Sequence, residues 1–341
     1  MAGNYIFSFL LALIVSAVTQ FLIIRLSHKR GIFIDDHESD QPQKFHDAPT
    51  PRIGGIGVFL ACLLIMLHGK IGIFLIISSI PAFLAGVFED FRGDMSPKIR
   101  LAIMLASGFL AIWLCDAVVT DFGFFSTPLW LGIIISFIAI VGVINGTNLI
   151  DGVNGNIGII CCIIFGSFAS LSYVLKDDFM LVANILIVGA LFGFLLFNYP
   201  RGQIFMGDGG AYLLGFLISV ISMIFARRHS AEISPIFVLV CVAYPVLEVI
   251  FSFSRKLFFE KIGPLHPDKL HLHQLIARGL CNGINSRVVL YIAPFIFANN
   301  FLAVKFYNNG PMLFCQTVVF LAIYIGTYVY LRKSDQSLEN T

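Results

Sequence analysis

The chain has 341 residues, of which 58% are hydrophobic and 12% charged, and its formal net charge is +2. Soluble domains are about 45 to 50% apolar and about 25% charged, so the composition excludes an ordinary soluble protein and indicates an integral membrane protein. A charge balance this close to zero gives no sign of a nucleic-acid partner.

Uncharged, mostly apolar runs recur along the whole chain. A helical span needs about 20 residues, so the shorter runs must include flanking residues to cross a membrane. Runs this long favour helices over barrel strands, which would alternate and be about 10 residues long. The sequence therefore predicts an all-α polytopic membrane protein with about 11 transmembrane helices. The expected spans are residues 1–24, 53–67, 71–88, 101–115, 122–150, 152–175, 179–200, 209–226, 233–247, 288–304 and 306–331.

The charge distribution predicts the orientation of these spans. The first run lacks the basic start and small-residue cleavage site of a signal peptide, so we expect it to remain as a span. With the N-terminus outside, most of the 22 basic residues fall in cytosolic segments, as the positive-inside rule requires, and Arg227 and Arg228 are the discordant pair. The C-terminus is then cytosolic. We expect one integral-membrane domain over residues 1–332 and a polar, frayed tail over residues 333–341.

The seven cysteines do not form a recognisable pattern. Their number is odd, most fall in or beside predicted spans, and no Cys-x-x-Cys occurs. The sequence therefore supports neither a disulfide framework nor a thiolate metal site.

The first long hydrophilic stretch, residues 25–52, leads into a turn rich in proline and glycine that ends at Gly55. The acids between residues 35 and 40 are typical of a solvated loop. Lys44 and Thr50 have a second interpretation. A cation and a hydroxyl close to a turn whose glycines expose backbone N–H groups suit contact with a phosphate.

Two adjacent carboxylates, Glu89 and Asp90, follow the third predicted span. Paired acids repel each other unless a cation or a proton lies between them, so this pair suits metal binding or proton transfer. The alternative is an interfacial helix end without a chemical role.

Four polar residues recur at every third position at the inner end of the fifth predicted span: Asn145, Asn148, Asp151 and Asn154. In a helix this spacing places them along one drifting face, and the three glycines among them indicate that the helix breaks here. Packing alone does not explain four such side chains at a membrane edge. Ligands that offer only oxygen suit a hard cation such as magnesium.

Asp208 lies in a glycine-rich stretch between the seventh and eighth spans. A carboxylate at the membrane edge needs water, a partner or a metal to offset its desolvation, and a simple wet turn is the alternative interpretation. In the ninth span, Glu248 and Arg255 are seven residues apart and are interpreted as a structural pair on one helix face.

The largest inside loop, residues 255–287, contains a basic, titratable group that could hold a diphosphate: Lys269, His271, His273 and Arg278. Zinc is the competing ligand, but neither His-Glu-x-x-His nor a cysteine set is present. The alternative without a ligand is an amphipathic loop helix.

These motifs follow spans one, three, five, seven and nine, so all five are predicted to face the same side of the membrane. Oxygen ligands for a metal and cations for phosphates would then meet in one shallow basin at the cytosolic surface. A water-soluble nucleotide and a membrane-held phosphate could meet there.

The five motifs, in this order, resemble those of the polyprenyl-phosphate N-acetylhexosamine-1-phosphate transferases, glycosyltransferase family 4. The resemblance covers Lys44 to Gly279 and rests on these stretches: the turn ending at Gly55, Glu89-Asp90, Asn148-Leu-Ile-Asp-Gly-Val-Asn-Gly155, Phe205-Met-Gly-Asp208 and His271-Leu-His-Gln274. Three positions depart from the family pattern. Glu89 replaces an aspartate, Asn154 a frequent aspartate, and Gln274 a frequent histidine.

The resemblance implies a magnesium-dependent enzyme, with manganese as an alternative ion. It would transfer a sugar 1-phosphate from a UDP-N-acetylhexosamine to undecaprenyl phosphate and release UMP. The domain over residues 1–332 would be catalytic, in a bacterial inner membrane with its active site in the cytosol. The His-x-His loop is closer to members that initiate O-antigen, common-antigen or teichoic-acid linkage chains, which would make the product the start of a cell-surface polysaccharide such as lipopolysaccharide. A homodimer is an open alternative to a monomer.

The resemblance also implies a role for each site residue. Asp208 and Asn148 would bind the metal. The catalytic set would be Glu89, Asp90, Asp151, His271 and His273, and substrate would be bound by Lys44, Thr50, Asn145, Asn154, Lys269 and Arg278. A transporter or flippase is the second class of function, and a lipid-phosphate hydrolase is the third. A transport path would need polar groups at mid-bilayer depth and internal symmetry, which the sequence does not show.

Overall fold

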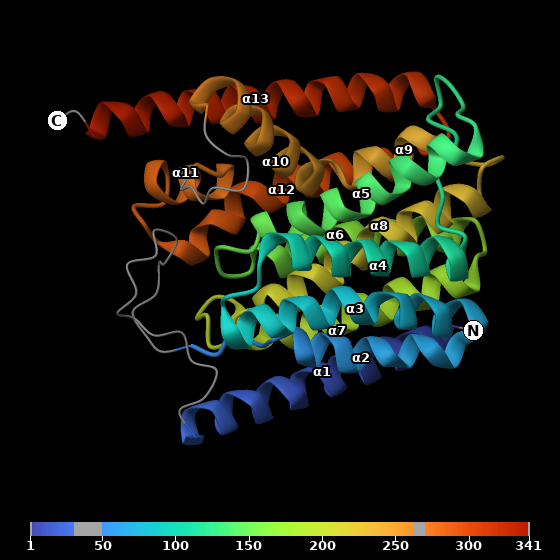
Figure 1. The fold of residues 1–341 in the computed structure, drawn as a ribbon, viewed down its shortest axis with the longest axis horizontal. Helices are drawn as coiled ribbons and strands as arrows, with labels where there is room; N and C mark the ends of the chain where they lie inside the picture. The colour runs from blue at the N-terminus through green and yellow to red at the C-terminus, as the bar shows by residue number, and fades with distance from the viewer. Residues whose placement is uncertain (1, 31–49, 262–269, 340–341) are drawn as a thin grey trace.

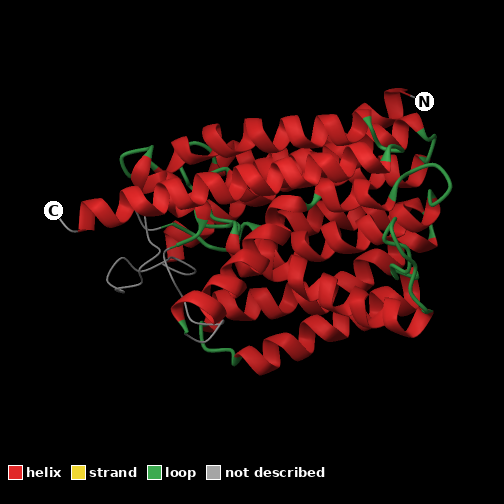
Figure 2. Ribbon diagram, turned by 90° about the horizontal axis from the view of Figure 1, so that it is seen from above, coloured by secondary structure: helices red, strands yellow, loops and turns green. Residues whose placement is uncertain are grey.

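The computed structural model describes residues 2–30, 50–261 and 270–339, and helices dominate throughout this part of the chain (Figure 1). No strand is present among these residues, and the hairpin after α4 contributes one isolated bridge between Asp121 and Ser126 (Figure 2). The prediction of an all-α membrane protein is confirmed. Lys44 and Lys269 lie outside the described residues.

The helices and helical turns are α1 (Ala2–Arg30), α2 (Gly55–Cys62), η1 (Leu63–His68), α3 (Lys70–Arg92), α4 (Pro97–Cys115), α5 (Leu129–Leu149), α6 (Asn156–Val174), α7 (Asp178–Asn198), α8 (Gly207–Arg228), α9 (Pro235–Cys241), α10 (Ala243–Ser254), η2 (Arg255–Glu260), α11 (Leu272–Gly279), η3 (Asn285–Arg287), α12 (Val288–Lys305) and α13 (Gly310–Glu339). Together they form one bundle whose loops gather at two opposite ends (Figure 2).

In the described part of the chain, nine helices are long and apolar enough to cross a membrane, or ten if a bent pair counts as one span. The bent pair is α9 with α10, which meet at 73°. The remaining predicted span corresponds to α2 and η1, a continuous apolar segment from Gly55 to His68 that is shorter than an ordinary span. Eleven apolar segments are thus present. The N-terminus and the C-terminus also lie on opposite sides of the bundle, as an odd number of crossings requires (Figure 1).

Helix α8 forms the centre of the bundle (Figure 1). In an apolar stretch of 18 residues in α8, 94% of the residues are buried inside the protein. The corresponding share is 17% in α1 and 22% in both α4 and α13. A helix that is apolar on all sides belongs in the interior, whereas helices with exposed apolar faces border the lipid. The residues at the start of α8 are therefore held by neighbours on several sides.

Glycines let the neighbouring helices approach the backbone of α8. A side chain at Gly55 of α2 would collide with the backbone of Gly210, and one at Gly86 of α3 would collide with the backbone of Asp208. On the α8 side, Gly215 packs against the backbone of α5 at Ile144. Small residues at such crossings are typical of membrane helices because they allow close van der Waals packing.

The discordant arginines at the end of α8 are both neutralised by carboxylates. Arg227 forms an ion pair with Asp116. Arg228 donates from Nε and Nη2 to the two oxygens of Asp177, at 2.7 and 3.0 Å. Since both charges are compensated, the pair does not argue against the predicted orientation.

The C-terminal tail differs from its prediction. We expected residues 333–341 to be frayed, but α13 continues as a helix to Glu339. The reason is that this extension has a partner, since Asp335 binds Arg278 of α11.

Candidate functional site

The carboxylate of Asp90, at the end of α3, caps the beginning of α8. Its Oδ1 accepts a hydrogen bond from the backbone N–H of Asp208 at 2.8 Å, and its Oδ2 accepts one from Gly209 at 2.9 Å. A carboxylate at a helix N-terminus satisfies otherwise unpaired N–H groups and complements the helix dipole. The two acids singled out from distant parts of the sequence are therefore adjacent, and Asp90 holds the backbone of Asp208.

The turn before Asp208 pairs with the turn before α2. The N–H of Phe205 donates to the carbonyl of Pro51, and the N–H groups of Gly54 and Gly55 donate to the carbonyls of Phe205 and Met206, each at 2.8 Å. These hydrogen bonds resemble a short ladder between two extended segments. They fix the proline- and glycine-rich turn of the first motif directly beside the Asp208 motif.

Gly207 makes the tight entry into α8 possible. Its φ of 75° lies in the left-handed region, and a side chain there would collide with the carbonyl of Arg52 and reach Asp90 Oδ2 at 2.6 Å. Only glycine meets both requirements without strain.

Arg52 is a site residue that the motif analysis did not single out. Its guanidinium interacts electrostatically with Asp90, Asp151 and Asp208, which come from three different motifs. Its position between Thr50 and Gly54, in the turn already interpreted as a phosphate contact, is the signal that could have indicated it. Thr50 is buried in the same turn.

Glu89 and Asp90 contact different partners. Its Oε2 accepts a hydrogen bond from the N–H of Met95 at 3.2 Å, and its Oε1 lies 4.0 Å from Nη1 of Arg100 on α4. Arg100 and Tyr212 both interact with Asp208 as well. The two adjacent acids thus have separate functions, since Asp90 binds the helix start while Glu89 and Arg100 form the flank of the site.

Asp151 lies in the turn after α5, where its N–H donates to the carbonyl of Asn148 at 3.2 Å. Burial raises the pKa of Asp151 to about 7; the charge of Arg52 opposes this shift, and the charge of Asp208 adds to it. The mutual repulsion of Asp151 and Asp208 shows that the predicted polar series does reach the Asp208 motif.

The side chains of Asn145 and Asn154, the two outer members of that series, form hydrogen bonds with other residues of the protein. The amide of Asn145 donates to the carbonyl of Val141 at 2.8 Å, inside α5. Asn154 donates from Nδ2 to the carbonyl of Pro200 at 3.0 Å and accepts from Nδ2 of Asn285 at 3.4 Å. In this structure Asn154 therefore joins three loops, and its predicted contact with substrate stays a prediction.

The histidine motif forms the N-terminus of α11. His271 and Gln274 make a capping box, and His271 Nδ1 lies 3.3 Å from Oε2 of Glu248 on α10. Glu248 was interpreted as the partner of Arg255, but its carboxylate here lies within hydrogen-bond distance of the first histidine of the loop. The rings of His271 and His273 are nearly parallel, with centroids 5.8 Å apart.

His273 connects this motif to Asp151. A side chain on Gly152 would lie only 2.7 Å from its Nε2, so the imidazole packs on the backbone next to Asp151. Burial lowers the pKa of His273 to about 4, aided by the charges of His271 and Arg278 and opposed by Glu248. No described residue provides a hydrogen-bond partner for its Nδ1. His273, which the sequence placed in a basic, titratable group, is thus a neutral, buried imidazole whose Nδ1 has no partner among the described residues.

Arg278, predicted to bind substrate, has a protein partner. Its Nε and Nη2 donate to the two oxygens of Asp335 at 3.0 and 2.9 Å.

Comparison with known proteins shows what the chain is similar to. Residues 72–226 match the profile of glycosyl transferase family 4. The chain is 26% identical to the probable undecaprenyl-phosphate N-acetylglucosaminyl 1-phosphate transferase of Bacillus subtilis, over 86% of this chain and 84% of that protein. It is 26% identical to an undecaprenyl-phosphate alpha-N-acetylglucosaminyl 1-phosphate transferase of Thermotoga maritima, over 93% and 96%, and 24% identical to that of Escherichia coli K12, over 86% and 83%. These similarities agree with the resemblance that the five motifs indicate.

The acids of this candidate site fit magnesium as a partner shared with substrate. Among the described residues, no three His, Cys, Asp or Glu side chains converge tightly enough to hold a metal ion by themselves. Magnesium does not need such a cage, because it commonly binds one or two carboxylates and completes its shell with water and phosphates. Asp90, Asp151 and Asp208 all interact electrostatically with the single cation of Arg52, so a divalent cation would offset the negative charge that remains.

Proposed function

We propose that this protein transfers a sugar 1-phosphate from a UDP-N-acetylhexosamine to undecaprenyl phosphate, giving an undecaprenyl-diphosphate sugar and UMP. The observation that carries the proposal is that Asp90, Asp151 and Asp208, from three different motifs, all interact electrostatically with Arg52. The relatives, which align over most of the chain, carry names that describe this reaction with N-acetylglucosamine. UDP-N-acetylglucosamine is therefore the first donor to test.

Asp208 and Asn148 would hold magnesium at the donor diphosphate, with manganese as a substitute. When bound, the ion supplies charge neutralisation for the phosphate of the departing UMP. Asp208 is suited to this role because Asp90 fixes its backbone and Gly207 leaves no freedom at the helix entry.

An oxygen of the lipid phosphate attacks the phosphorus that carries the sugar, and the bond from that phosphorus to the UMP oxygen breaks. The second pKa of a phosphate monoester is near 6, so the attacking group is largely ionised at neutral pH and needs no strong base. Both oxygens of Asp90 accept backbone hydrogen bonds. We therefore assign Asp90 to orientation of the site, with Glu89 and Arg100 on the acceptor side.

The free Nδ1 of buried His273 supports a ligand on the opposite side of the site. A buried polar atom without a partner costs free energy, which a hydrogen bond to substrate would recover. We place His271, His273 and Asp151 next to the donor nucleotide.

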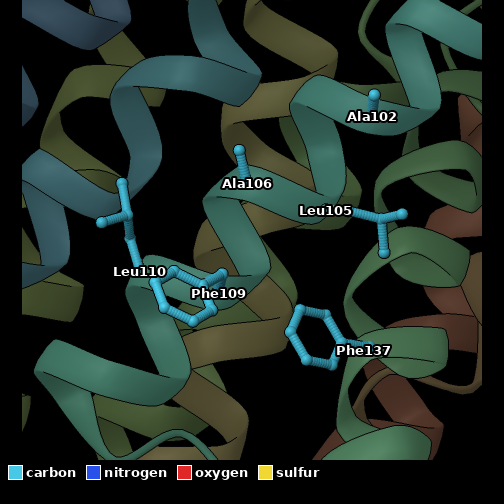
Figure 3. Close-up of a pocket in the computed structure, with 6 residues that line it drawn as sticks. All are labelled: Ala102, Leu105, Ala106, Phe109, Leu110 and Phe137. Carbon is cyan, nitrogen blue, oxygen red and sulfur yellow. The ribbon is translucent and has the colours of Figure 1, made fainter.

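A shallow apolar groove of about 650 Å³ lies between α4 and α5, and we propose that it binds the prenyl chain of the lipid acceptor (Figure 3). It is lined by Ala102, Leu105, Ala106, Phe109, Leu110 and Phe137. The two alanines leave space between the larger side chains, and the groove begins two residues after Arg100. A prenyl chain in this groove would bring its phosphate to the flank formed by Arg100 and Glu89.

We place the site at the cytosolic face of a bacterial inner membrane, where UDP-sugars are made. The excess of basic residues on that side supports this orientation.

The test is an assay of UMP release from UDP-sugars by the protein in detergent or vesicles, with and without undecaprenyl phosphate. Release that requires the lipid and yields a lipid-linked sugar phosphate supports the transferase. Release of phosphate from the lipid without any UDP-sugar would instead identify a hydrolase. A transporter is not favoured, because the site residues lie at one end of the bundle and the relatives are transferases.

A further inference from the structure

One face of α13 is buried along its length, although most of this helix borders the lipid. Tyr324, Tyr328 and Leu331 are buried at helical spacing. The rings of Tyr324 and Tyr328 contact Phe251 of α10, with centroids 5.6 and 4.5 Å away. The same face reaches Asp335, one turn beyond Leu331. Helix α13 therefore forms a wall behind the part of α10 that carries Glu248.

Asp335, at the end of this buried face of α13, forms a bidentate ion pair with Arg278. The two hydrogen bonds measure 3.0 and 2.9 Å, and the side chains are 12% and 28% exposed. Arg332 lies 3.8 Å from the same carboxylate. Two parallel hydrogen bonds from a planar guanidinium fix direction as well as distance.

Helix α11, which carries Arg278, is the element that places the histidines. It has eight residues, so it is too short to be stable alone, and its orientation must come from its contacts. Leu331 packs against Gly279 at its end, Glu248 binds His271 at its start, and His273 lies against Gly152. Rotation of α11 about its axis would move His273 away from Asp151.

We propose that Asp335 is a positioning residue for the transfer reaction. It holds Arg278, and through Arg278 it fixes α11 so that His273 stands beside the Asp151 turn and His271 beside Glu248. This inference rests on the proposed function and gives the end of α13 a role in donor binding. It also assigns Arg278 to orientation of the loop in place of direct contact with a phosphate.

The kinetic test compares Asp335→Asn, Arg278→Gln and the double variant. Displacement of a positioned group by about 1 Å can lower a rate by about 100-fold, so a loosened α11 should raise KM for the UDP-sugar by at least about 10-fold. KM for undecaprenyl phosphate should stay unchanged. The double variant should be no worse than either single variant, because both remove the same interaction. Asp335→Glu should restore most of the affinity, and Lys333→Gln, which removes a charge from the same turn, should behave as wild type.

A second measurement does not depend on activity. Cys281 follows α11 directly and is 1% exposed. Its rate of labelling by a maleimide, followed by mass spectrometry of its peptide, should rise in Asp335→Asn and Arg278→Gln but not in Lys333→Gln.

Three results would overturn the inference. Loss of donor affinity in Arg278→Gln with wild-type kinetics in Asp335→Asn would show that Arg278 contacts the phosphate itself. A lower Tm with equal changes in both KM values would reduce the ion pair to a general stabiliser. Unchanged kinetics and unchanged Cys281 labelling in both Asp335→Asn and Arg278→Gln would show that the ion pair does not position α11. A wild-type protein that forms no UMP, but whose Cys281 labelling responds as expected, would refute the proposed reaction and leave the positioning intact.

Discussion

The backbone N–H of Asp208 donates to the carboxylate of Asp90 at 2.8 Å, across 118 residues of sequence. One acid therefore fixes the place of another. The pair links α3 to the central helix α8, and Gly207 and Gly86 allow the approach because neither carries a side chain. Asp208 projects from a helix start that is held on several sides, which suits a group that must bind a cation in a fixed position.

This relationship predicts different effects for the two acids. Asp208→Asn should lower UMP release by on the order of 100-fold or more, with Tm close to wild type, because the helix start remains capped. Asp90→Ala should lower both activity and stability, with about 1 to 2 kcal/mol lost from the cap. UMP release and Tm in detergent measure the two effects. Wild-type activity in Asp208→Asn would remove the metal assignment.

The crossing of α3 and α8 predicts a sharp response at Gly86. Gly86→Ala would place a methyl group against the backbone of Asp208, and such overpacking typically costs about 1 to 3 kcal/mol. Asp208 would move, so activity should fall with Tm. Gly142→Ala is the matched control, since Gly142 also lies inside a helix but has open space around it. There alanine should be neutral or stabilise by up to about 1 kcal/mol. Equal Tm values for the two variants would contradict the close crossing.

The sequence indicated much of this arrangement. Unbroken apolar runs predicted the helices, and the odd-numbered positions of the polar motifs predicted their meeting at one end, because successive spans alternate in direction. Asp90, Asp208, Asp151 and His273 do lie in one connected group. The charge of Asp208 acts on Asp151 although 57 residues separate them.

The partners of the charged groups were not predictable in the same way. Arg278 binds Asp335, also 57 residues away, and Glu248 binds His271 instead of sharing a helix face with Arg255. These pairs depend on how α10, α11 and α13 pack, which periodicity does not reveal. The burial of His273 was not predictable for the same reason. Its pKa is set by burial, and a motif does not show which histidine is buried.

Burial of His273 predicts that stability falls in mild acid. The folded pKa is about 4, below the ordinary value of 6.5, so between these values the unfolded chain binds a proton that the folded protein excludes. Stability is full above pH 6.5 and is lost as the pH falls toward 4. By pH 5 the free energy of unfolding has fallen by about 2 kcal/mol because of this histidine. In His273→Gln this loss is absent, so the Tm of the variant relative to wild type should rise from pH 7.5 to pH 5. A constant difference would mean that the imidazole is not excluded from water.

The two arginines at the far end of α8 predict unequal effects of the same substitution. Arg228 binds Asp177, whose side chain is 3% exposed, caps α7 and also lies 3.0 Å from His229 Nε2. Arg227 and its partner Asp116 are 52% and 65% exposed. Arg228→Gln should therefore cost about 1 to 3 kcal/mol, because a buried carboxylate loses a charged donor, whereas an exposed pair contributes at most about 1 kcal/mol.

Tm measurements of Arg228→Gln and Arg227→Gln at neutral pH test this prediction, with each variant serving as the control for the other. Burial opposes ionisation of Asp177, but the hydrogen bonds from Arg228 and Met180 outweigh it and hold the pKa of Asp177 below its ordinary value. The stabilisation is therefore present above the ordinary pKa, about 3.8, and is lost as the pH falls through the folded value. UMP release per folded molecule should be unchanged in both variants, because α8 separates this cluster from Asp208 by its whole length. A loss of activity in Arg228→Gln without a loss of stability would show that the two ends of α8 are coupled.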